Sequence, residues 1–204
     1  MIHVVDYGLG NVGAFLTLYK RLEIPAVAAT SPAELAEADH IVLPGVGSFD
    51  HAMQSLNASG MREMLDRLVV ERKVPVLGVC VGMQILGGRS DEGREAGLGW
   101  ISGSIRDLAG RREGHNGLPL PHMGWNDVQP QRDEALLAGI PDPRFYFLHS
   151  FYFDNDDDAD VAATVEYGAR FTCMVNRGNI WGVQFHPEKS HRYGMALLKN
   201  FSEL

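Results

Sequence analysis

The chain has 204 residues, a formal net charge of −8, and hydrophobic and charged fractions of 45% and 22%, which are typical of a soluble globular protein. This length suits one domain with a sizeable core, so we expect residues 1–204 to form a single domain. The acidic balance without a basic stripe argues against nucleic-acid and acidic-membrane partners. The N-terminus has neither a basic leader nor a long apolar run, which argues against a signal peptide or membrane span. Because two cysteines, Cys80 and Cys173, are too few for a disulfide framework, a reducing, cytoplasmic setting is expected.

In the first half of the chain, short apolar runs alternate with helical patterns. Strands are expected at residues 2–5, 24–29, 40–43 and 74–79, and helices at 12–22, 50–56, 61–71 and directly after Cys80. Strands that alternate with helices of this length form βαβ units. We therefore predict an α/β fold with a mostly parallel central sheet flanked by helices.

The second half is richer in strand-like segments. These segments are residues 118–128, 145–153, 161–167, 172–175 and 180–185, followed by a closing helix at 193–201. The turn Asn176-Arg177-Gly178-Asn179 predicts a hairpin between the last two strands. Additional antiparallel strands are therefore expected in the C-terminal half, and residues 111–117 are expected to form a surface loop.

The segment Gly78-Val79-Cys80-Val81-Gly82 directly follows a buried-strand pattern. A nucleophile between small residues at this point is typical of a sharp strand-to-helix turn that leaves the nucleophile exposed at its tip. A helix that begins near Val81 would direct its positive end at the Cys80 sulfur and favour the thiolate. The backbone N–H of Val81 would then be available to an oxyanion.

A second motif, His186-Pro187-Glu188, also follows a predicted strand. A cysteine, a histidine and a carboxylate two residues beyond it can act as nucleophile, base and orienting group. A lone cysteine is more often a small buried hydrophobe and a lone histidine is usually structural. The two motifs together, each at a strand end, favour a Cys80, His186 and Glu188 triad, whereas Cys173 is expected to be inert core.

The first strand is followed by Gly8-Leu9-Gly10-Asn11-Val12-Gly13, which fits the G-x-G-x-x-G pattern of dinucleotide sites. That pattern also requires an acidic residue at the end of the second strand to hold the ribose. Here the second strand ends in Ala28-Ala29-Thr30. We therefore expect no nicotinamide cofactor.

Two features could suggest a metal, and neither fits well. His122 and His149 each lack a second His or Cys at ligand spacing. The acidic run at residues 154–160, read as a calcium loop, places Ala159 where glycine is needed and Val165 where a bidentate Glu belongs. A solvated loop between strands and no metal site are predicted.

Two of these segments also resemble a known family. G-V-C-V-G-M-Q at residues 78–84 and G-V-Q-F-H-P-E-K-S at residues 182–190 are similar to the signature segments of class I, triad-type glutamine amidotransferases. The resemblance implies a flavodoxin-like arrangement of the sheet and a glutaminase that needs no cofactor. In such an enzyme Cys80 attacks the side-chain amide of L-glutamine, His186 transfers protons, Glu188 orients His186, and Gln84 contacts the substrate.

Four further segments narrow the resemblance to the glutaminase subunits of imidazole glycerol phosphate synthase. They are D-Y-G-L-G-N at 6–11, P-G-V-G-S-F at 44–49, P-H-M-G-W-N at 121–126 and Y-F-L-H-S-F at 146–151. This resemblance implies an oxyanion hole at Val81, Val46 and Gly47, glutamine contacts at Gly45, Gln84, His149, Ser150 and Phe151, and a partner face at Asn11, Trp125 and Tyr146. The partner would be a (β/α)8-barrel cyclase subunit that uses the ammonia to make imidazole glycerol phosphate and AICAR in histidine biosynthesis.

Two other interpretations stay open at this point. A paralogous glutaminase could supply a different synthase, for example one that amidates a nucleotide-sugar precursor, and residues 189–194 do depart from the usual family continuation. A cysteine peptidase or γ-glutamyl hydrolase would also use a Cys-His pair at an elbow. Partner-independent activity on peptides would favour this last interpretation.

Overall fold

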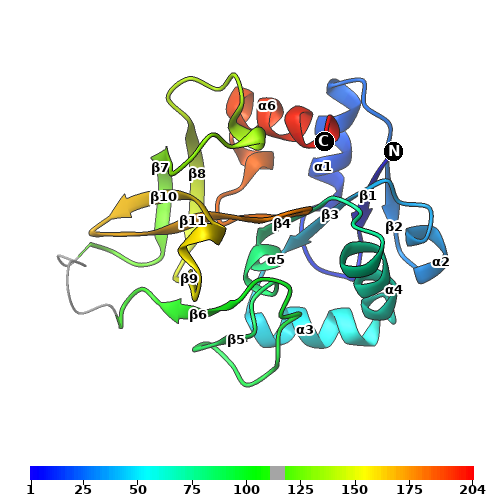
Figure 1. The fold of residues 1–204 in the computed structure, drawn as a ribbon, viewed down its shortest axis with the longest axis horizontal. Helices are drawn as coiled ribbons and strands as arrows, with labels where there is room; N and C mark the ends of the chain where they lie inside the picture. The colour runs from blue at the N-terminus through cyan, green and yellow to red at the C-terminus, as the bar shows by residue number, and fades with distance from the viewer. Residues whose placement is uncertain (111–117) are drawn as a thin grey trace.

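The computed structural model describes residues 1–110 and 118–204, so the surface loop expected at 111–117 lies outside the described residues. Within them, a 12-stranded sheet runs through the molecule with the main order β2-β1-β3-β4-β12-β11-β10-β7-β8. Helices cover both of its faces, with α1 and α6 on one side and α3 and α5 on the other (Figure 1). The predicted α/β fold is confirmed.

The parallel half of the sheet holds the strands that the apolar runs predicted. Its members are β2 (Ala26–Ala29), β1 (Ile2–Val5), β3 (His40–Gly45), β4 (Val76–Cys80) and β12 (Ile180–Val183), each parallel to the next. Strands β1, β4 and β12 are buried along their whole length, because helices cover both faces of this half. Such double burial explains why these segments are continuous apolar runs rather than alternating patterns.

Five of the helices lie within a few residues of the predicted positions: α1 (Val12–Arg21), α3 (Phe49–Ala58), α4 (Arg62–Asp66), α5 (Val81–Gln84) and α6 (His191–Ser202). The short α2 (Pro32–Leu35) was not among the predicted helices. The helix expected at 61–71 changes to a π-helical turn over Arg67–Glu71. Short 3-10 turns lie at Ala135–Leu137, Asp158–Asp160 and Pro187–Lys189, the last of which we call η4.

The antiparallel half continues from β12 through a hairpin, as predicted. Its strands are β6 (Gly103–Asp107), β7 (His122–Pro130), β8 (Arg144–His149), β9 (Phe151–Asn155), β10 (Val161–Tyr167) and β11 (Ala169–Arg177). The short β5 (Arg89–Ser90) pairs with β6 in parallel. The single strand expected at 145–153 is in fact two strands that part at Ser150. Strand β8 pairs with β7, whereas β9 pairs with β6 and β11, so the chain must change neighbours at this residue.

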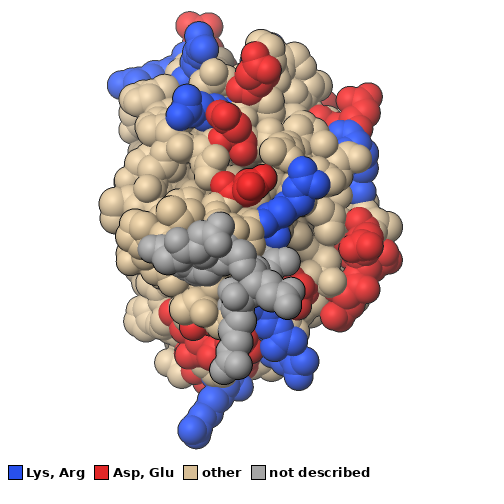
Figure 2. All heavy atoms as spheres, turned by 90° about the vertical axis from the view of Figure 1, so that its left-hand side faces the viewer, with Lys and Arg blue, Asp and Glu red and all other residues tan. Residues whose placement is uncertain are grey.

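The acidic run at 154–160 is not simply a solvated loop, and this prediction was wrong at its end. Asp160 is buried and forms an ion pair with Arg177 of β11, with 2.7 Å between the charged atoms. Elsewhere, the face shown in Figure 2 carries Lys and Arg among Asp and Glu. In the described part of the chain, no helix has the length and apolar character needed to span a bilayer.

Candidate active site

The predicted sharp turn is present at Cys80. This residue ends β4 and precedes α5, with φ 56° and ψ −113°. Positive φ is rare for a residue with a side chain, and such strain costs about 1–3 kcal/mol and persists where surrounding packing imposes it. Helix α5 spans one turn only, so it supplies free N–H groups, starting at Val81, rather than the field of a long helix.

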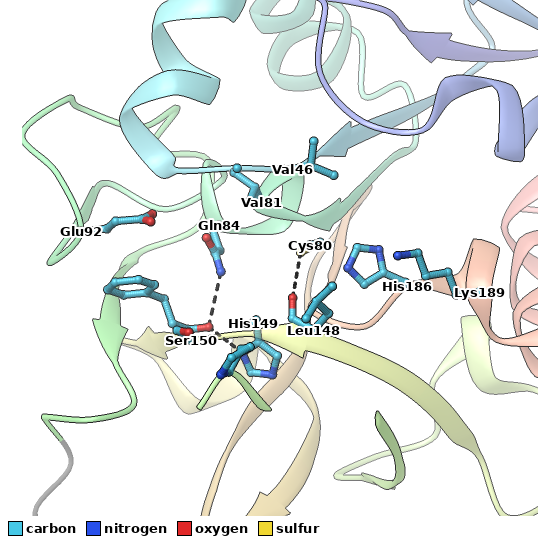
Figure 3. A pocket seen from close by; sticks show the side chains of 13 residues that line it. Val46, Cys80, Val81, Gln84, Glu92, Leu148, His149, Ser150, His186 and Lys189 are labelled. Atoms are coloured by element: carbon cyan, nitrogen blue, oxygen red, sulfur yellow. Dashed lines mark hydrogen bonds between the residues drawn. The ribbon is translucent and has the colours of Figure 1, made fainter. Parts of the chain in front are cut away.

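The His186 segment reaches the same place because β12 and β4 are parallel neighbours. Their register pairs Val183 with Val79, so the residues that follow both strands meet at the carboxyl edge of the sheet. His186 Nδ1 lies 2.7 Å from Glu188 Oε1. The Nε2 atom is buried, has no hydrogen-bond partner among the described residues, and belongs to a ring that lies beside Cys80 (Figure 3).

The ionisation of His186 follows from these neighbours. Burial alone lowers the pKa of its imidazole, but the contacts with Cys80 and Glu188 outweigh burial and raise the pKa to about 10. The ring therefore favours its protonated form at neutral pH. A protonated imidazole beside a sulfur stabilises negative charge on it and can deliver a proton to a leaving group.

A cavity of about 300 Å³ opens at Cys80, within the size range of small-ligand sites. Its lining brings together the following predicted site residues: Val46, Gly47, Cys80, Val81, Gln84, His149, Ser150, Phe151 and His186. Figure 3 shows Val46 and Val81 on one side of Cys80, Leu148 and His149 on another, and His186 beside it. The lining residues come from both halves of the sheet, so neither half forms the cavity by itself.

Gly45 is not among the described residues that line this cavity. A Cβ at this position would lie 2.5 Å from the backbone nitrogen of Gly82. The glycine is therefore explained by the close approach of β3 to α5, and its position gives no support to the predicted contact with glutamine.

The end of β3, which leads into the loop with Val46 and Gly47, is contacted by Tyr7 and by the segment that resembled a dinucleotide fingerprint. The Tyr7 hydroxyl donates to the Pro44 carbonyl at 2.8 Å. A Cβ at Gly10 would lie 2.7 Å from Pro44 Cβ, so only glycine allows this approach. Gly47, further along the loop, has φ +87°. The first glycine-rich segment thus packs against the second, which carries two of the predicted oxyanion-hole residues.

His122 and His149 form a pair that their sequence spacing did not reveal. The register of β7 and β8 places them opposite each other, with His122 Nδ1 2.9 Å from His149 Nε2. Burial lowers their pKa values to about 4 and about 3, so both rings are neutral at physiological pH. His149 Nδ1 also lies 2.8 Å from the Phe151 carbonyl. In the described part of the chain, no group of three or more His, Cys, Asp or Glu is placed to hold a metal ion.

Three polar residues of the site had no predicted role. Gln184 is fully buried, with Nε2 3.8 Å from Cys80 Sγ. Ser190 accepts from the Tyr146 N–H at 3.0 Å and donates to the His186 carbonyl at 2.6 Å, and so fixes the start of η4. Both lie inside the segment at 182–190 that carried the resemblance. Glu92 lines the cavity from the loop after β5, for which the sequence held no comparable signal.

The residues predicted to face a partner are accessible to different degrees. Asn11 is exposed, and its side chain caps α1 by accepting from the Ala14 N–H at 3.1 Å. Trp125 is 38% exposed, and its ring stacks on His191 with centroids 5.5 Å apart. Tyr146 is half-buried beside Trp125, with centroids 6.3 Å apart.

Comparison with known proteins supports the same class. The family model "Glutamine amidotransferase class-I" matches residues 3–203. A crystal structure of a glutamine amidotransferase superposes with a TM-score of 0.76 at 18% identity, covering 99% of this chain and 97% of that one. PurLQS from Thermotoga maritima superposes with a TM-score of 0.72 at 18% identity, over 99% and 97% of the two chains. At these identities, the structures show the fold alone.

The fold, the family model and the arrangement around Cys80 define a class I glutamine amidotransferase. Among curated relatives, imidazole glycerol phosphate synthase subunit HisH of Bdellovibrio bacteriovorus is 57% identical over 100% of both chains. The HisH of Leptospira interrogans is 49% identical, and HisH 2 of Pseudomonas aeruginosa 47% identical, again over 100% of both chains. The chain belongs to the HisH family of imidazole glycerol phosphate synthase subunits.

Proposed function

We propose that this chain is the glutaminase subunit of an imidazole glycerol phosphate synthase. It hydrolyses L-glutamine to glutamate and ammonia, and a cyclase subunit uses the ammonia to make imidazole glycerol phosphate and AICAR in histidine biosynthesis. The main observation that supports this proposal is the position of Cys80, which lies on a strained turn, beside the His186–Glu188 pair, and lines the cavity. The full-length identity to HisH proteins favours this function over a paralogous glutaminase or a peptidase.

The proposed mechanism assigns one role to each triad member. The Cys80 thiolate attacks the side-chain amide carbon of glutamine and forms a tetrahedral oxyanion. Protonated His186 gives its proton to the amide nitrogen, ammonia leaves, and a thioester remains. Neutral His186 then takes a proton from water, whose oxygen attacks the thioester, and collapse of the second oxyanion releases glutamate and Cys80. Glu188, bonded to Nδ1, orients the ring and stabilises its charged form.

The oxyanions need two donors, which we assign to Val81 N–H and to the peptide around Val46 and Gly47. All three residues line the cavity next to Cys80. Loss of one such donor costs about 10²- to 10³-fold in rate. Reorientation of one peptide in this glycine-containing loop would therefore switch the activity on or off, and we propose that the partner controls it.

The polar groups around the cavity suit an amino acid. The carboxylate of Glu92 and the amide oxygen of Gln84 can accept from the α-ammonium group. Backbone groups of the segment from His149 to Phe151, where the chain changes strands, can bind the α-carboxylate. These contacts leave the side-chain amide of the substrate directed at Cys80, as attack requires.

We further propose that a (β/α)8-barrel cyclase subunit docks over Asn11, Trp125 and Tyr146. Met123, which precedes Trp125 on β7, is 59% exposed, and large apolar side chains on a surface are typical of interaction sites. Both cysteines are free, which suits the reducing cytoplasm where we place the complex.

The decisive experiment measures glutamate release from glutamine by the chain alone and with the histidine-pathway cyclase subunit and its nucleotide ligand. We expect weak activity alone and strong stimulation by the liganded partner. A glutamine-analogue electrophile should label Cys80 and spare Cys173, which is fully buried. Cys80→Ser should keep the complex and its synthesis from added ammonium while abolishing glutamine-dependent turnover. High activity without a partner would refute the dependence, and failure to label Cys80 would refute the site.

A further inference from the structure

Gln184 lies against the nucleophile, and the mechanism above gives it no role. It follows β12 and is completely buried. Its Nε2 is 3.8 Å from Cys80 Sγ, and its Oε1 is 3.1 Å from Gln84 Nε2. It therefore bridges the reacting sulfur and a residue that lines the substrate cavity. A buried amide in such a place needs both of its ends satisfied.

The direction of these hydrogen bonds is fixed by a backbone carbonyl. Gln84 Nε2 lies 3.4 Å from the Phe151 oxygen, which can only accept, so the NH₂ end of the Gln84 amide must face it. The same NH₂ group supplies its second hydrogen to Gln184, which must then present its oxygen. The remaining end of Gln184, its NH₂ group, is thereby directed at Cys80.

The histidine pair fixes the same carbonyl from the other side. His149 Nδ1 lies 2.8 Å from the Phe151 oxygen and must carry the hydrogen there. Because the ring is neutral, its Nε2 is an acceptor, and His122 Nδ1 donates to it at 2.9 Å. Both lone pairs of the Phe151 carbonyl are thus occupied. Neither the Gln84 amide nor the Gln184 amide can reverse without breaking a buried hydrogen bond.

We propose that Gln184 is a further catalytic residue, whose amide N–H stabilises the negative charge on Cys80 Sγ and whose amide oxygen holds Gln84 with its own oxygen toward the substrate ammonium group. This inference rests on the proposed glutaminase function and deepens it. In the thiol state Cys80 Sγ instead faces an acceptor, the Leu148 carbonyl at 4.0 Å. The site therefore offers the sulfur an acceptor when it is protonated and a donor when it is ionised.

Other groups also act on the sulfur and must stay constant in a test. They are His186, which contacts both Cys80 and Glu188, and the Tyr7 hydroxyl, whose pKa is raised by burial and by the nearby Cys80. His149 acts indirectly, through its electrostatic interaction with His186. None is altered by a substitution at Gln184. A change in the pH dependence of Cys80 reactivity then reports the amide donor.

The test is the rate of Cys80 alkylation by iodoacetamide in the full chain between pH 5 and 10. Cys80→Ser supplies the background from Cys173. Gln184→Met keeps the length of the side chain and removes the donor, and Gln184→Asn withdraws the amide by one methylene. Gln54→Met is the matched control, because Gln54 lies exposed on α3 and its amide bonds Glu95. Glutamine KM and kcat are measured in parallel with the partner present.

We expect Gln184→Met to move the midpoint of the alkylation profile upward by about one pH unit and to slow labelling below the midpoint about tenfold, the scale of one hydrogen bond to a charged group. KM should rise as well, because Gln84 loses its partner. Gln54→Met should match the wild type. If Gln184→Met does not fold, Gln184→Asn is the test, and its alkylation midpoint should also move upward. Unchanged midpoints in the folded variants overturn the role of Gln184, whereas an unreactive wild-type Cys80 overturns the active site itself.

Discussion

The environment of His186 differs strongly from that of a free side chain. Its buried ring lies between Glu188 and Cys80, and these two neighbours raise its pKa to about 10 against the opposing effect of burial. The raised pKa links chemistry to stability. Protonation of His186 stabilises the folded protein fully below pH 6.5, its ordinary pKa, and this contribution is lost as the pH rises toward 10.

Glu188→Gln should lower the pKa of His186, because the amide keeps an acceptor but lacks the negative charge. We expect a decrease of about 1–3, typical of losing an opposite charge at contact distance. An NMR titration of the His186 ring measures it. Glu203→Gln removes the same charge on the exposed end of α6 and should leave the titration unchanged. Equal titrations in wild type and Glu188→Gln would show that Cys80 alone sets the ionisation.

Among the elements, the end of β3 that leads into the next loop contacts a residue that is distant in sequence. Tyr7 is buried, and burial raises the pKa of its phenol, so the hydroxyl stays protonated and donates to Pro44. This bond attaches Pro44, in the last part of β3 and two residues before Val46, to the segment whose exposed end is Asn11. The proposed partner face and the strand that leads into the proposed oxyanion loop are therefore in direct contact.

Tyr7→Phe should leave the Pro44 carbonyl without its donor and loosen the end of β3 from which this loop starts. We expect kcat with the partner to fall several-fold and stability to fall by about 1 kcal/mol, the usual value for one hydrogen bond. Tyr19→Phe is the matched control, because the buried Tyr19 hydroxyl has no hydrogen-bond partner among the described residues. It should keep kcat and full stability. Identical behaviour of the two variants in glutaminase assays and thermal melts would contradict the attachment.

Continuous apolar runs predict β1, β4 and β12 correctly, because both faces of these strands are buried. Features that depend on pairing partners distant in the chain were not predicted. Residues 145–153 read as one strand, but Ser150 separates two strands with different neighbours. The proximity of His122 to His149 follows from the register of β7 and β8, and the burial of Asp160 follows from Arg177. Each of these features depends on residues far apart in the chain, so a short stretch of sequence could not predict it. Glu92 reaches the cavity for the same reason.

For the whole molecule, the stability of the fold depends on pH through histidines buried in the antiparallel half of the sheet. The antiparallel half buries two neutral histidines in its interior next to the cavity. In the unfolded chain these rings bind protons below about pH 6.5, whereas in the folded protein they do so only near pH 4 and pH 3. The unfolded state therefore gains protons first as the pH falls, and stability must decrease below pH 6.5.

His149→Asn should reduce this acid sensitivity. The Asn NH₂ group can replace the Nδ1 donor to the Phe151 carbonyl, and the titratable ring is removed. We expect lower stability than wild type at pH 7.5, because the bond to His122 is lost, but a smaller further loss between pH 6.5 and 4.5. Urea unfolding across this range measures both. His51→Asn alters an exposed ring that water solvates in both states, and it should keep the wild-type slope. Parallel slopes in all three proteins would rule out the buried pair as the cause.

The pairing of β4 with β12 has a consequence for how this glutaminase could be combined with a different synthase. Cys80 ends β4 and His186 follows β12, and these two strands pair with each other, whereas Val46 after β3 and Met123 and Trp125 of β7 are exposed at the surface. Substitutions at these exposed positions would change which synthase subunit binds and receives the ammonia, and they would leave the geometry of Cys80 and His186 unchanged. To supply ammonia to a different synthase, the exposed residues should therefore be replaced and the paired strands β4 and β12 kept.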